Sequence, residues 1–173
     1  TATAQARGIV VSNGIPTITN NTIRNLSNSS SNTGGAPNNT VIGLVMNSSS
    51  AGVTITGNTI HSLFLNSAVT TGQLQAVGIF YSGATTGTNI VSKNFIHSFD
   101  ATAVNPAIFL TGMDISGGSA AFFNNMIRLG VKPDGTDLST ALTLRGISSN
   151  SGNTLGFYFN SIYIGGTGVG TNA

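Results

Sequence analysis

Five side chains with binding chemistry recur at one position of a sequence repeat. Each directly follows the isoleucine of an Asn-x-Ile triplet, and together they are Arg24, His61, His97, Arg128 and Tyr163. Neighbouring residues of a strand point to opposite faces, so an inward isoleucine predicts that the next residue points outward. If the triplets lie in register, these residues form a surface stripe, which we call the binding column. The stripe could stack on sugar rings or pair with an acidic polymer, or its long amphipathic side chains could only supply the polar outer face that such a fold needs.

The two histidines predict that binding by this column depends on pH. Protonation of His61 and His97 below about pH 6.5 would add two charges between Arg24 and Arg128. Repulsion along the column would lower the histidine pKa values further. We therefore expect a polysaccharide or a cell-surface glycan as the partner, bound more tightly in acid.

The acids are too few to predict a complete catalytic site. The chain has no glutamate, and its four aspartates are Asp100, Asp114, Asp134 and Asp137. Cleavage of acidic polysaccharides needs a cluster of acids around Ca²⁺ or two or three close aspartates. Asp114 is predicted to project outward alone, whereas Asp134 and Asp137 flank Gly135 in a turn sequence that could ligate a cation but more simply forms the turn. We expect no enzyme, no cofactor, and no metal site apart from this weak candidate.

A row of asparagines is predicted to be structural. The first residues of the five triplets are Asn21, Asn58, Asn94, Asn125 and Asn160. Asparagine tolerates left-handed backbone geometry better than other non-glycine residues, so we place a corner of the chain there. In coils stacked about 4.8 Å apart, the side-chain amides would bond from coil to coil as an asparagine ladder. Such a ladder explains the row without any ligand.

The repeat that positions these residues predicts the fold. A glycine flanked by apolar residues precedes each triplet, and these glycines are Gly8, Gly43, Gly78, Gly112 and Gly146. Their spacing of 35, 35, 34 and 34 residues is typical of a solenoid. β-Branched and aromatic residues in short runs favour three strands per repeat: one through the glycine, one ending at the asparagine and one beginning with the isoleucine. Apolar residues lie two positions before and one position after the glycine, so the alternation of inward-facing and outward-facing residues shifts by one residue there. This shift predicts a bulge or bend.

These observations predict an all-β, right-handed parallel β-helix of about five coils, with residues 1–173 as a single domain and coils starting near residues 8, 43, 78, 112 and 146. Two core rows are expected. The row before the asparagines contains Ile18, Ile55, Val91, Phe122 and Phe157, and the row after them contains Ile23, Ile60, Ile96, Ile127 and Ile162. Neither end shows the atypical polar coil that caps a solenoid, so we expect the chain to be an excerpt of a longer protein.

Composition restricts the possible partners. Only 6% of the 173 residues are charged, and 39% are hydrophobic. The net charge of +2 comes from the scarcity of acids, which argues against a nucleic-acid partner. There is no cysteine for disulfides or thiolate metal sites, and no apolar run of about 18 residues that would insert into a membrane.

With the Asn-x-Ile triplets and glycine strands in view, the chain resembles the right-handed parallel β-helix repeats of the pectate-lyase-like superfamily. More narrowly, residues 112–115 with 122–130, and residues 157–165, are similar to repeats of very long surface proteins secreted by Bacteroidota. The resemblance implies a secreted or cell-surface protein exported through an outer membrane, with the type IX secretion machinery as a transient partner.

Three functions fit this sequence. The first is a non-catalytic surface module, part of an adhesin stalk or a filament. The second is a carbohydrate-binding or carbohydrate-active β-helix whose catalytic acids lie on coils outside this excerpt. The third, an ice-binding solenoid, needs a sustained threonine face, which Thr17-Ile-Thr19 and Thr54-Ile-Thr56 begin but Ile90-Val-Ser92 and Ala121-Phe-Phe123 do not continue.

Overall fold

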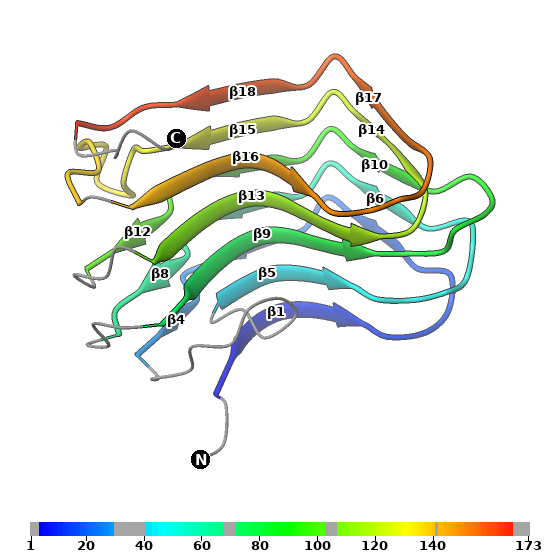
Figure 1. Cartoon of the computed structure of the whole chain (residues 1–173), viewed down its shortest axis with the longest axis horizontal. Helices are drawn as coiled ribbons and strands as arrows, with labels where there is room; N and C mark the ends of the chain where they lie inside the picture. Colours follow the sequence, from blue (N-terminus) through cyan, green and yellow to red (C-terminus); the bar gives the residue numbers. More distant parts are fainter. Residues whose placement is uncertain (1–3, 30–40, 68–71, 103–106, 141, 168–173) are drawn as a thin grey trace.

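The chain folds as a parallel β-solenoid. The computed structural model describes residues 4–29, 41–67, 72–102, 107–140 and 142–167, and these residues contain strands but no helix. All pairings between the named strands are parallel, and the strands stack into a solenoid in which each of the three main sheets has five strands, one from each repeat (Figure 1). The predicted all-β parallel β-helix is confirmed. No element in the described ranges could serve as a membrane-spanning helix.

Three five-stranded sheets form the walls of the solenoid. Sheet A contains the glycine strands β1 (Ala6–Val11), β5 (Val41–Met46), β9 (Leu74–Ser82), β13 (Ile108–Gly117) and β16 (Thr143–Ser149). Sheet B contains β2 (Thr17–Thr19), β6 (Thr54–Thr56), β10 (Ile90–Ser92), β14 (Ala120–Phe123) and β17 (Leu155–Tyr158). Sheet C contains β3 (Thr22–Arg24), β7 (Thr59–His61), β11 (Phe95–His97), β15 (Met126–Leu129) and β18 (Ser161–Ile164). In each sheet the strand order follows the coil order, so the first and last coils form the two ends of the stack.

A fourth, narrow sheet was not predicted. Sheet D contains β4 (Ser27–Asn28), β8 (Phe64–Leu65) and β12 (Asp100–Ala101). In the first three coils the residue after the binding column has a positive φ of 55–58°, at Asn25, Ser62 and Ser98, and this bends the chain from sheet C into sheet D. Two-residue strands beside asparagine and serine carry too little periodicity to be recognised in a sequence. The polar segment of residues 27–37, rich in serine and asparagine, lies largely outside the described residues.

Both predicted core rows are confirmed. Register pairing places Ile18, Ile55, Val91, Phe122 and Phe157 in one row and Ile23, Ile60, Ile96, Ile127 and Ile162 in the other. The first four members of each row are at most 7% exposed. Phe157 and Ile162 are 44% and 47% exposed, because no described coil covers them. The core is therefore continuous through the stack and open at its last coil.

The repeat glycines mark a close approach between walls. The predicted shift in the alternation is confirmed: Val41 and Leu44 belong to the main core, while Ile42 and Val45 lie in a separate buried cluster with Val77 and Phe80. A Cβ placed on Gly78 would lie 2.6 Å from the carbonyl oxygen of Gly112 and 2.6 Å from Cγ2 of Ile96. Contacts this short are not tolerated, so glycine is required where the isoleucine row of sheet C packs against sheet A.

The candidate binding column and the asparagine ladder

The binding column exists as a register-aligned row on sheet C. Pairing proceeds Arg24 to His61, His61 to His97, His97 to Arg128 and Arg128 to Tyr163. The isoleucine before each of these residues lies in the core row, so the column lies on the outer face. Arg24 and Tyr163 are exposed, whereas the three central side chains are half-buried. Sequence reasoning thus brought together five residues that the fold does align.

The aromatic rings of the column stack on each other. The ring centroids of His61 and His97 are 4.9 Å apart with the planes within 6° of parallel, and the ring of Phe95 lies 4.2 Å from that of His97. The facing surfaces of these rings are therefore covered, which removes them as platforms for a sugar. Within the described residues, neither histidine Nε2 has a hydrogen-bond partner. The histidines can therefore contact a ligand through hydrogen bonds at Nε2, and not by stacking of their covered ring faces on a sugar.

A serine orients each histidine. His61 Nδ1 lies 2.9 Å from Ser62 Oγ, and His97 Nδ1 lies 2.8 Å from Ser98 Oγ. Arg128 Nη2 donates to the same Ser98 Oγ at 3.3 Å, so this hydroxyl joins the arginine of one coil to the histidine of the neighbouring coil.

The electrostatics differ from the predicted pH switch. Burial, then the neighbouring His61 and Arg128, lowers the pKa of His97 to about 4. Burial, then Arg24, lowers the pKa of His61 from its ordinary value of 6.5. His97 therefore does not acquire charge just below pH 6.5, whereas the predicted lowering of both histidine pKa values is confirmed in direction; burial contributes more to this lowering than the predicted repulsion. At neutral pH the column carries charge only at its two arginines.

Two hollows flank the column. One, of about 340 Å³, lies across the corner between sheets C and D and is lined by Asn25, Leu26, Ser27, Ser62, Phe64, Asp100 and Pro133. The other, of about 250 Å³, lies beside the last two column residues and is lined by Met126, Ile127, Arg128, Ser161, Ile162 and Tyr163. The first hollow combines an aromatic ring, amide and hydroxyl groups with the carboxylate of Asp100, and this combination suits sugar hydroxyls.

The asparagine ladder is present through all five coils. In each step the backbone N–H and the Nδ2 group of one asparagine donate to Oδ1 of the asparagine in the next coil, at 2.9–3.0 Å. From Asn58 onward, Nδ2 also donates to a carbonyl in the preceding coil, such as that of Ile18 or Ile55. Asn58, Asn94 and Asn125 are at most 1% exposed. These bonds occupy the amides, so the row is structural.

The corner at the ladder differs from the prediction in one respect. The left-handed residue is the one before each ladder asparagine, with φ of 53–71° at Asn20, Gly57, Lys93, Asn124 and Phe159. The ladder asparagines themselves do not have positive φ, so the hydrogen bonds of their amides, and not a left-handed backbone, explain asparagine at these positions. Left-handed geometry costs roughly 1–2 kcal/mol for residues such as lysine or phenylalanine, and we attribute its retention there to the ladder that spans the corner.

The four aspartates lie in three separate parts of the fold. Asp100 is in β12, Asp114 is in β13, and Asp134 and Asp137 belong to the turn after β15. Asp134 Oδ1 accepts from Thr136 N at 2.9 Å and from Thr136 Oγ1 at 2.7 Å, and the side-chain bond is the main reason why the pKa of this exposed carboxyl is lowered. The candidate cation ligand therefore closes its own turn. Among the described residues, no three histidine or acidic side chains are grouped for a metal ion.

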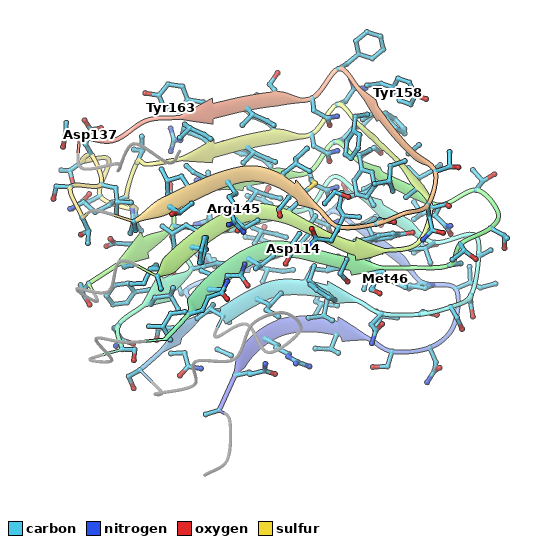
Figure 2. All side chains as sticks on the ribbon, in the orientation of Figure 1. Met46, Asp114, Asp137, Arg145, Tyr158 and Tyr163 are labelled. Atoms are coloured by element: carbon cyan, nitrogen blue, oxygen red, sulfur yellow. The ribbon has the colours of Figure 1, made fainter. Side chains whose placement is uncertain are left out.

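Asp114 is not the isolated exposed acid that the sequence suggested. It lies on the outer side of sheet A but is only 5% exposed; burial raises the pKa of its carboxyl, while the nearby Arg145 lowers it. Figure 2 shows Asp114 and Arg145 on neighbouring strands of this wall. Arg145 also lies over the ring of Phe109, 4.1 Å from its centroid. In the sequence, the position of Arg145 just before a repeat glycine was the available signal for this grouping.

Other buried polar groups were missed. Asn89 is 2% exposed, accepts from the N–H groups of Gly52 and Val53, and donates to the carbonyl of Ser119, so it links three coils. Gln75 Oε1 and Thr111 Oγ1 are buried on sheet A without a hydrogen-bond partner. None of these residues recurs from coil to coil, so the repeat pattern contains no signal for them.

The fold and these contacts define a parallel β-solenoid whose coils are joined by an internal asparagine ladder and whose sheet C carries an outward column of Arg, His and Tyr. No protein-family model matches the chain, and comparisons with curated proteins and with solved structures gave no significant match.

Proposed function

We propose that this chain is a non-catalytic β-solenoid module of a secreted or cell-surface protein, in which the stacked coils form part of a stalk or filament. The observation that carries the proposal is the ladder: each of the five coils contributes one asparagine to a single hydrogen-bonded column. A stalk or filament must resist separation of its coils along the axis of the stack. One asparagine in each coil that bonds to the neighbouring coil provides this.

The distribution of polar groups supports a structural role. The coils are near-equivalent in sheets B and C, and the aspartates are spread over sheets A and D and one turn. Neither hollow beside the column is lined by two acids, whereas glycoside hydrolysis needs a pair of acids across one substrate position. Location outside the cell, and export by an outer-membrane secretion machinery, rest on the resemblance of the repeats to those of secreted surface proteins.

The proposal is tested by combining an activity screen with limited proteolysis. The purified chain is incubated with neutral and acidic polysaccharides, and release of reducing ends or unsaturated products is measured. We expect no release, and a protease-resistant core in which cuts fall between coils and not within sheets A to C. Depolymerisation that is lost in Asp114→Asn would contradict the proposal, because that variant removes the one buried carboxylate.

A second candidate function, binding of an acidic glycan, is favoured by the geometry of the binding column. Arg24 and Arg128 supply two permanent charges, and between them two neutral histidines present Nε2 groups at the 4.9 Å spacing of their rings. Arginine pairs with carboxylates in bidentate geometry, and the imidazoles can bond hydroxyls. The charged groups suit a uronic-acid polymer better than a neutral one.

Binding by the column has a distinct pH signature. We expect affinity for a polyuronate to fall with added salt and in Arg24→Gln and Arg128→Gln, and we expect His97 to add no positive charge between pH 7.5 and about pH 5.5, because burial lowers the pKa of that histidine to about 4. Lys93→Asn is the matched control: it removes one positive charge at a corner where Asn20 and Asn124 hold the same left-handed conformation. Binding that weakens equally in the control would show non-specific charge attraction and not a site.

A further inference from the structure

The hollow of about 340 Å³ between sheets C and D, which we call the corner hollow, lies on the side wall of the solenoid and is lined by residues of four coils. Sheet D contributes one row to its lining: in register, Ser27 of β4 pairs with Phe64 of β8, and Phe64 pairs with Asp100 of β12. Figure 1 shows these three strands side by side. Successive coils therefore place a hydroxyl, an aromatic ring and a carboxylate in one row, about 4.8 Å apart.

The alternation of side chains in sheet D points this row outward. The residues on either side of Phe64 and of Asp100 are at most 2% exposed and belong to the core. Phe64 and Asp100 themselves are half-buried, and Ser27 is exposed. Because neighbouring residues of a strand point to opposite faces, the ring and the carboxylate face the hollow and solvent.

The lining of the corner hollow is held in place by backbone hydrogen bonds. The N–H groups of Phe64 and Asp100 donate to carbonyls of the preceding coil at 2.9 and 3.0 Å. Pro133, which also lines the hollow, belongs to a turn closed by a bond of 2.8 Å from Lys132 N to the carbonyl of Thr136. A preformed site loses little conformational entropy when it binds a ligand.

The polar groups of the hollow have unused hydrogen-bonding capacity. Within the described ranges, no hydrogen bond involves the side chain of Asn25 or Ser27. Asp100 Oδ1 accepts from Ala101 N at 2.8 Å, and Oδ2 has no protein donor among the same residues. No aromatic ring in this part of the chain stacks on Phe64. The corner hollow therefore offers the uncovered aromatic face that the histidines of the binding column lack.

The charges around the corner hollow favour a neutral ligand. Among the residues that line it or adjoin a lining residue in the chain, Asp100 and Asp134 are balanced by Arg24 and Lys132. A further neighbour, His61, is neutral at pH 7, because burial lowers its pKa. Asp100 is the one charged group in the lining itself, so it repels a carboxylate such as that of a uronic acid, while the positive neighbours disfavour an amine.

We propose that the corner hollow binds one neutral hexose unit of a glycan. The C–H face of the sugar lies on the ring of Phe64, a sugar hydroxyl donates to Asp100, and the amide of Asn25 and the hydroxyl of Ser27 bond further hydroxyls. Small-molecule sites combine an apolar lining with a few placed polar groups and have volumes of roughly 300–1,000 Å³. The hollow is near the lower limit of this range, which suits a single sugar unit. The site differs from the binding column in place and in ligand, and depends neither on the column nor on the structural role.

The experiment measures binding by NMR, with the methyl glycosides of glucose, galactose and mannose as neutral probes and with glucuronate and glucosamine as charged probes. Phe64→Ala removes the ring, and Asp100→Asn removes the charge but keeps an oxygen that can accept from Ala101 N. Phe109→Ala and Asp137→Asn are the matched controls, since they change a half-buried phenylalanine of sheet A and an exposed aspartate, neither of which lines the hollow. Far-UV circular dichroism checks that every variant is folded.

At least one neutral glycoside is expected to shift the amide signals of residues 25–27, 62–64 and 100, with a Kd of about 1 mM, because a single sugar makes few contacts. Phe64→Ala and Asp100→Asn should each weaken this binding at least about tenfold, whereas the two controls should stay within about twofold of the wild type. Glucuronate and glucosamine should bind at least about fivefold more weakly than the neutral sugar. Should Phe64→Ala lose the fold of sheet D, the pair Asp100→Asn and Asp137→Asn gives the same test.

Three results would overturn the proposal: no binding of any neutral glycoside, equal weakening in the control variants, or tighter binding of either charged probe. Shifts confined to the signals of His97 and Arg128 would also overturn it, because they would place the sugar on the binding column. None of these outcomes refutes the structural role, which is tested by polysaccharide cleavage. The column, in turn, is tested by titration with a polyuronate.

Discussion

The ladder predicts that one interior asparagine contributes far more to stability than its counterpart in the first coil. The Asn94 side chain makes four hydrogen bonds: Oδ1 accepts from N and Nδ2 of Asn58, and Nδ2 donates to the carbonyl of Ile55 and to Oδ1 of Asn125. Asn94→Ala removes all four and leaves the buried N–H of Asn58 without an acceptor. The Asn21 side chain donates only two bonds, one of them to the exposed carbonyl of Thr19.

The expected magnitudes follow from these bonds. An unpaired buried donor costs roughly 1–3 kcal/mol, and each of the other lost bonds contributes roughly 0.5–1.5 kcal/mol. Allowing for relaxation, we expect Asn94→Ala to lower the free energy of unfolding by about 3–5 kcal/mol, and Asn21→Ala by about 1 kcal/mol or less. For a chain of this size, the first value corresponds to a fall in Tm of roughly 6–20 °C.

The assay is equilibrium unfolding in guanidinium chloride, followed by far-UV circular dichroism. The slope of the transition must be the same for both variants, because a changed slope would indicate partial unfolding of the stack. Equal, small shifts in midpoint for Asn94→Ala and Asn21→Ala would refute the reasoning and show that water satisfies the interior amides as readily as those at the end.

Three further changes test other parts of the structure by the same unfolding assay. Gly78→Ala should destabilise by about 1–3 kcal/mol through overpacking against sheet C, whereas Gly152→Ala, with no neighbouring atom within 4 Å of its Cβ position, should have little effect; equal effects would contradict the close approach. Because the folded-state pKa of His97 is about 4, below its ordinary 6.5, unfolding takes up a proton in this window. Stability should therefore fall as the pH decreases from 6.5 to about 4, and less so in His97→Gln; an NMR titration of His97 near 6.5 would show that the ring is not desolvated. Burial raises the pKa of Asp114, so its ionised form is a cost that disappears in acid, and Asp114→Asn should raise the unfolding midpoint more at pH 7 than at pH 3; a lowered midpoint at pH 7 would mean that Arg145 more than offsets the burial.

Repetition explains why much of the fold could be predicted from the sequence. In a solenoid, residues at equivalent positions of successive repeats stack, so a period of 34–35 residues identifies partners in space without any knowledge of the loops. The alternation of side chains in strands then determines which positions face inward. For this reason the two core rows, the asparagine ladder and the membership of the binding column were all accessible from the order of residues alone.

The sequence by itself therefore determined the architecture, the register and the residues that share a column. Only the tertiary structure determined the pKa values, the burial and the side-chain contacts of these residues. The pKa values of His61 and His97 depend on burial and on charges contributed by other coils, and the burial of Asp114 depends on what packs against the outer side of sheet A. Such quantities depend on distances between groups that no repeat encodes. Periodicity specifies which residues are neighbours, whereas desolvation, ring stacking and hydrogen-bond competition at each site arise only when the folded chain excludes water from it.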